Sequence, residues 1–148
     1  MLTKETKDRI DRARQILVGQ LPLPSDQIEL ITIALIYKFM DDMDEQAREL
    51  GGKASFFIGK LRDYAWREVV ANKLSAEERV TRFIHGIEEL SKPENRHLPD
   101  LFQSIFRNTF LKFRDGRTLK LFLLCSLFFK ELCFLSRTCC SRLCSRLK

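Results

Sequence analysis

Hydrophobic residues recur three and four positions apart along most of this chain, and short stretches with proline or glycine separate the periodic segments. This spacing places apolar side chains on one face of a helix. No segment alternates between apolar and polar residues as a half-buried strand does. We therefore predict an all-α fold, a bundle of five or six helices joined by short Pro/Gly loops. The predicted helices cover about residues 3–18, 26–50, 60–72, 76–90 and 99–115.

Capping residues and hydrophobic runs refine this prediction. Ser75 and Glu78 have the spacing of a capping box, in which each side chain hydrogen-bonds the other residue's backbone amide. Gly116 is predicted to end the last helix. The first half of the segment 26–50 is apolar on nearly all sides, which is typical of the central helix of a bundle. The residues predicted to pack in the core are Ile31, Leu35, Phe39, Phe106 and Phe110.

The second half of the same predicted helix, residues 41–49, is acidic, and we expect it to leave the core. Asp41 lies on one helical face with Asp44 or Glu45, which raises the alternative of a divalent-metal or acid–base site. No histidine or loop geometry accompanies these carboxylates. We therefore interpret them as a solvated face or a partner-docking surface.

Charge and cysteine content divide the chain into two parts near residue 120. The formal net charge of +6 lies wholly in residues 117–148, and all five cysteines lie in residues 125–148. The body before them is neutral overall and is not expected to bind DNA strongly on its own. Because that body has no cysteine, and the chain starts with a charged segment instead of a signal peptide, we expect a cytoplasmic protein.

A resemblance to a known family becomes visible at the second predicted helix. Residues 25–42, SDQIELITIALIYKFMDD, resemble a signature of the modification subunit of type I restriction–modification systems. The stretches 9–23 and 106–117 resemble the same proteins, and the likeness extends over about residues 1–122. It implies that residues 1–120 form the helical N-terminal domain of an adenine-N6 DNA methyltransferase subunit. Those subunits use S-adenosylmethionine.

The resemblance also implies a role and a set of partners. In such complexes the helical domain helps to hold DNA near the catalytic domain and senses whether the target adenine is already methylated. Two modification subunits pair and are held by a specificity subunit, which reads the DNA sequence. A separate restriction subunit is added for cleavage. We therefore expect these subunits and double-stranded DNA as partners.

The motifs that carry methyl transfer in that family are missing from this chain. The family has a Gly-rich cofactor turn after its first strand and an Asn/Asp-Pro-Pro-aromatic loop that grips the flipped adenine. This sequence has no Pro-Pro pair, and its only adjacent glycines, Gly51 and Gly52, follow a predicted helix. We assign no catalytic, cofactor-binding or metal-binding residue, and we expect this chain alone to be inactive and to bind no cofactor.

The family-like pattern ends where the composition changes, and residues 121–148 form an atypical tail rich in Leu, Phe, Cys and Arg. We expect a shifted reading frame or a truncated gene as its origin; the nucleotide sequence after codon 122 tests this. The uninterrupted apolar run, residues 121–129, is shorter than the roughly 20 residues that cross a membrane. We predict another amphipathic or poorly ordered helix, with an interfacial basic helix as the alternative. The cysteines lack the paired C-x2–4-C spacing that is typical of a zinc site, so we expect them to be free thiols.

Two groups of residues lie on the last predicted helix or directly after it. An aromatic stripe is interpreted as core, because aromatic residues at helical spacing more often pack inside than stack on bases; it comprises Phe102, Phe106, Phe110 and Phe113. Basic residues around this stripe are candidates for contacts with phosphates or a partner, with ordinary solubilising charge as the alternative. They are Arg107, Lys112, Arg114 and Arg117. The alternative function is a stand-alone helical adaptor whose basic tail docks a partner or a membrane surface.

Overall fold

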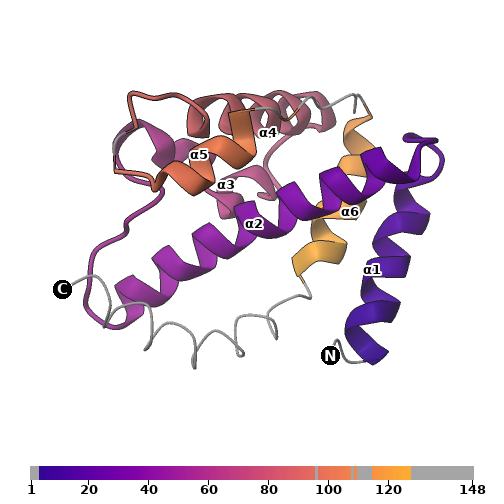
Figure 1. The fold of residues 1–148 in the computed structure, drawn as a ribbon, viewed down its shortest axis with the longest axis horizontal. Helices are drawn as coiled ribbons and strands as arrows, with labels where there is room; N and C mark the ends of the chain where they lie inside the picture. The colour runs from indigo at the N-terminus through magenta and orange to yellow at the C-terminus, as the bar shows by residue number, and fades with distance from the viewer. Residues whose placement is uncertain (1–3, 96, 108, 110–114, 128–148) are drawn as a thin grey trace.

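The computed structural model describes residues 4–95, 97–107, 109 and 115–127, and Figure 1 shows its arrangement. Every regular element within these ranges is helical, which confirms the all-α fold. One of the elements, η1, is a 3-10 helix. In chain order the elements are α1 (Lys4–Leu17), α2 (Pro24–Glu49), η1 (Gly59–Tyr64), α3 (Trp66–Val69), α4 (Ala76–Leu90), α5 (Asp100–Arg107) and α6 (Gly116–Leu127).

The central element of the bundle is α2, a helix of 26 residues. Pro24 occupies its first turn, where a missing amide hydrogen costs no helical hydrogen bond. The helix ends one residue before Leu50, and Gly51 follows with a left-handed φ of 77°, a conformation that glycine adopts without steric cost. Figure 1 shows α3, α4 and α5 along one side of α2, and α1 and α6 near its N-terminal half. The long apolar run in the sequence therefore forms the middle of the fold, as predicted.

The core contains an aromatic cluster centred on Tyr37, a residue of α2 that is fully buried. Its ring stacks on the rings of Phe57 and Phe83, with centroid separations of 5.5 and 5.6 Å. The rings of Trp66 and Phe106 meet it edge-on, both at 6.1 Å. Such contacts add to the stabilisation that burial of aromatic surface provides. The cluster joins α2, α3, α4, α5 and the segment before η1.

The five residues predicted from the sequence as core differ in their burial. Ile31 and Phe106 are buried. Leu35 is half-buried and packs against the core, and Phe39 is half-buried. Phe110 lies outside the described residues, as does Phe113 of the aromatic stripe.

The single helix predicted at residues 60–72 is wrong, because the structure has two short elements there. Ala65 separates η1 from α3 and has an extended ψ of 146°. The Tyr37 hydroxyl donates a hydrogen bond to the Tyr64 carbonyl, which in a continuous α-helix would accept from the amide of Glu68. The Glu68 amide instead donates to the Ala65 carbonyl at 2.8 Å. A tertiary hydrogen bond thus replaces a local one and breaks the helix.

The capping box predicted at the start of α4 is present. The Ser75 hydroxyl accepts a hydrogen bond from the Glu78 amide at 3.2 Å, and the Glu78 carboxylate accepts one from the Ser75 amide at 2.8 Å. These hydrogen bonds hold the pKa of Glu78 below its ordinary value. The box begins a helix that ends at Leu90, close to the predicted end.

The prediction that Gly116 ends a helix is wrong, because α5 ends at Arg107 and Gly116 begins α6. The side chain of Asp115 caps α6: its carboxylate accepts hydrogen bonds from the amides of Arg117 and Thr118 at 3.2 and 3.1 Å. Glycine is required there by packing, since a Cβ at residue 116 would lie 2.0 Å from the carbonyl oxygen of Ala76. The sequence does not show that the N-termini of α4 and α6 approach so closely.

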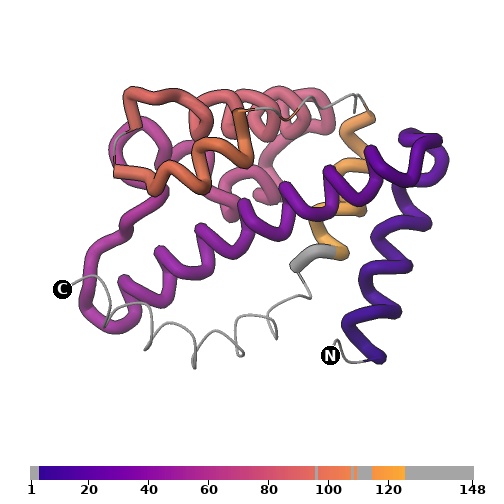
Figure 2. Tube along the Cα trace, in the orientation of Figure 1, coloured from indigo at the N-terminus to yellow at the C-terminus, as the bar shows by residue number. Residues whose placement is uncertain are grey.

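The last helix within the described residues, α6, belongs to the bundle. It packs against α1, α4 and α2, and Figure 2 shows it beside the N-terminal helix α1. Leu119, Phe122 and Leu123 are buried in the common core. The domain boundary predicted at residue 120 therefore falls inside a continuous helix, and residues on both sides of it contribute to the core.

Candidate functional site

The basic residues predicted to contact phosphates or a partner do not form one surface in the described part of the chain. Arg107 lies at the end of α5 and Arg117 in the first turn of α6, and both are exposed. Figure 1 shows the end of α5 and the start of α6 apart from each other. Lys112 and Arg114 lie outside the described residues. The two described arginines thus provide separate positive charges on different elements.

In the acidic half of α2, the structure buries two of the carboxylates that the sequence placed on a solvated face, whereas Glu45 and Glu49 are exposed. Asp41 and Asp44 are buried, with exposed fractions of 3% and 1%. Asp44 accepts hydrogen bonds from three successive backbone amides, those of Ser55, Phe56 and Phe57, at 2.6, 3.0 and 2.7 Å. A buried carboxylate is tolerated when donors surround it in this way. Asp44 therefore fixes the segment after α2 along the side of that helix.

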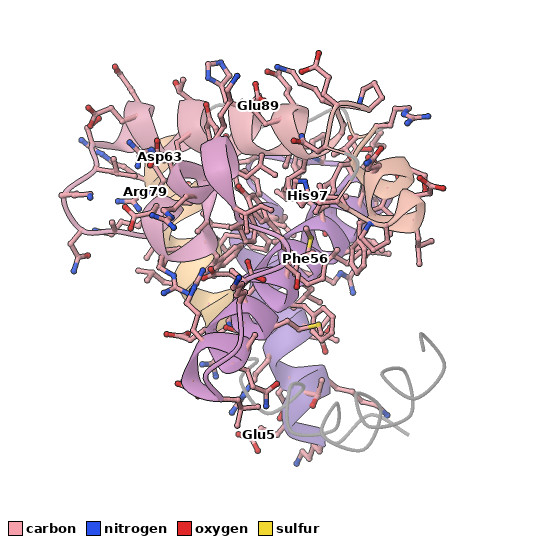
Figure 3. The ribbon with its side chains drawn as sticks, turned by 90° about the vertical axis from the view of Figure 1, so that its left-hand side faces the viewer. Glu5, Phe56, Asp63, Arg79, Glu89 and His97 are labelled. Atoms are coloured by element: carbon pink, nitrogen blue, oxygen red, sulfur yellow. The ribbon has the colours of Figure 1, made fainter. Side chains whose placement is uncertain are left out.

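The segment fixed by Asp44 is also held from its other side. The Nε2 atom of His97 lies 3.2 Å from the Phe56 carbonyl oxygen. The ring of Phe56 meets that of Phe102 edge-on at 5.3 Å. Figure 3 shows Phe56 and His97 close to each other in the middle of the molecule. These contacts join residues that lie more than 40 positions apart in the chain, with no sequence motif that would indicate the pairing.

Replacing Asp44 with asparagine tests its role. The asparagine amide group has one acceptor oxygen and brings donor hydrogens toward backbone amides that are donors themselves. We expect the free energy of unfolding to fall by about 2 kcal/mol, because buried amides lose their acceptor. Urea unfolding followed by circular dichroism measures the change. The control is Glu45→Gln, at a half-exposed carboxylate in the next position; equal stability of the two variants would contradict this role of Asp44.

Asp41 is paired with Arg67 at the start of α3. Its carboxylate accepts hydrogen bonds from the Arg67 backbone amide and from the guanidinium nitrogens Nε and Nη2, at 3.2, 3.3 and 3.2 Å. A third group, Glu45, lies 3.9 Å from the same guanidinium. Burial raises the pKa of Asp41, and the charge and hydrogen bonds of Arg67 oppose that rise. The arrangement connects α2 to α3.

The pH dependence of stability tests the environment of Asp41. A raised pKa in the folded state means that the native protein holds this proton more tightly than the unfolded chain does. The free energy of unfolding of the wild type, relative to Asp41→Asn, should therefore fall as pH rises through the interval between the two pKa values. Urea unfolding of both proteins between about pH 3 and pH 7 measures this difference. A difference that grows with pH would contradict a raised pKa.

Asp41 and Asp44 are thus part of the packing of the bundle. Besides Asp41 and Asp44, Asp42 forms an ion pair with the buried Lys38 one turn earlier. Across the residues that the structure describes, no group of three or more His, Cys, Asp or Glu side chains could hold a metal ion. Among the cysteines, the structure describes Cys125, and burial raises the pKa of its thiol. The other four cysteines lie outside the described residues.

An open groove lies between η1 and α4, with a volume of about 540 Å³. Its charged side chains have both signs, and Figure 3 shows Asp63 of this groove in the upper left part of the view. Glu78 is committed to the capping box of α4. A smaller groove of about 230 Å³ lies between α2 and α5. The larger groove is lined by Asp63, Tyr64, Glu77, Glu78, Thr81, Arg82 and His85.

Two further observations bear on the function. Of the helices described, none has the length and apolar character needed to cross a membrane. Comparison of the chain with protein-family models, curated proteins and solved structures finds no significant match in any of the three.

Proposed function

We propose that this chain is the non-catalytic N-terminal part of a type I restriction–modification DNA adenine methyltransferase subunit. The observation that supports the proposal most is the place of residues 25–42. This run, which resembles the signature of that family, lies within the central helix α2 of an all-α bundle. The resemblance implies a helical N-terminal domain, and an all-α bundle is consistent with it.

Several positions of residues 25–42 serve the packing of the domain. Ile31, Ala34 and Tyr37 are buried against other elements of the bundle. Tyr37 stacks on Phe57 and Phe83, so the buried part of the run contributes to the packing of the domain. Contacts with DNA and with other subunits then fall to exposed residues such as Arg107 and Arg117.

The proposed role is to help DNA engagement, methylation-state sensing and assembly with the specificity subunit. Methyl transfer and S-adenosylmethionine binding belong to the catalytic domain of the intact subunit, and the chain works in the cytoplasm with DNA. Its partners are the specificity subunit, a second modification subunit and the restriction subunit. Because the body is neutral, the chain relies on the assembled complex to bind DNA.

Assembly is the experiment that tests this function. We expect an affinity-tagged specificity subunit from a type I system to retain the full-length chain after co-expression. Added intact modification subunit should displace it, since both use the same helical domain. Isothermal titration calorimetry of the chain with S-adenosylmethionine should show no binding. Clear cofactor binding would overturn the assignment as a non-catalytic part, and absence of capture would favour the stand-alone adaptor.

The retained complex also allows a test of the exposed arginines. Arg107→Glu and Arg117→Glu should each weaken binding of duplex DNA to the captured complex and reduce the salt dependence of the affinity by about one phosphate contact. Lys53→Glu, at an exposed position in the segment after α2, is the control for the change in net charge. Fluorescence anisotropy at several salt concentrations distinguishes the variants. Equal losses in all three would show a net-charge effect without a defined contact.

A further inference from the structure

We draw no further inference here: the strongest candidate, the open groove between η1 and α4 with its exposed Asp63, Glu77 and Glu78, is a cluster of charged side chains at a helix N-terminus, and nothing in the described part of the structure shows which ligand or partner would occupy it.

Discussion

Replacing Gly116 with alanine should lower the free energy of unfolding by about 3 kcal/mol. The added Cβ would lie 2.0 Å from the Ala76 carbonyl oxygen and 2.8 Å from its Cα atom. These are backbone atoms at the start of α4, so no side-chain rotation relieves the overlap. Helix α6 must move away from α4, which loosens the packing of Leu119 in the core.

The close approach and helix propensity predict opposite changes in the free energy of unfolding for Gly116→Ala. Intrinsic helix propensity alone favours alanine over glycine by about 1 kcal/mol, so a protein without the close approach would become more stable. Thermal and urea unfolding of the purified variant measure the change. The matched control is Gly19→Ala, because a Cβ at residue 19 meets no atom within 4 Å. Equal or greater stability of Gly116→Ala would show that α4 and α6 do not meet at this glycine.

Replacing Arg79 with methionine should also lower the free energy of unfolding by about 3 kcal/mol. Arg79 is 1% exposed, and its guanidinium donates to the carbonyl oxygens of Val69, Ala71 and Leu74, at 2.6, 3.0 and 3.1 Å. The Val69 carbonyl is at the end of α3, and the other two belong to the turn between α3 and α4. Methionine keeps an apolar stem of similar length but has no donor, so buried carbonyl oxygens lose their partner.

The control for this change is Arg82→Met, three positions later on the same helix. Arg82 is half-buried at the groove between η1 and α4, and its removal should alter the free energy of unfolding by less than about 0.5 kcal/mol. Figure 3 shows Arg79 on the same side of the molecule as Asp63, a residue that lines that groove. Urea unfolding of both variants gives the comparison. A similar, small effect of both would contradict the role of Arg79 as the support of the turn.

Much of the secondary structure could be predicted from the sequence, because its signals are local. The capping box of Ser75 and Glu78 involves residues three positions apart. The start of α2 predicted at about residue 26 is two residues after the observed one at Pro24, and its end precedes a glycine that adopts a left-handed φ. Each of these features requires only the conformation of one helix turn. The apolar run in α2 also predicted correctly which helix would be central.

The candidate site could not be predicted in the same way. Asp44 looks like one more member of an acidic, solvated run, yet it binds amides 11 to 13 residues later. Arg79 looks like an ordinary basic residue of an amphipathic helix. Whether a charged side chain is buried depends on which backbone groups the fold leaves unpaired beside it. Local sequence does not contain that information.

The sequence by itself determined the helical fold class, the approximate bounds of α1, α2 and α4, and a resemblance that supports the proposed function. Helix periodicity, caps and breakers act within a few residues, so they can be interpreted before the chain is folded. Only the tertiary structure decided that Ala65 breaks a helix, that Gly116 begins one, and that Asp41 and Asp44 of α2 are buried. These outcomes depend on segments that are distant in the sequence and meet only in the folded chain. Tyr37 bonds the carbonyl before Ala65, Ala76 lies against Gly116, and the amides of the segment after α2 donate to Asp44.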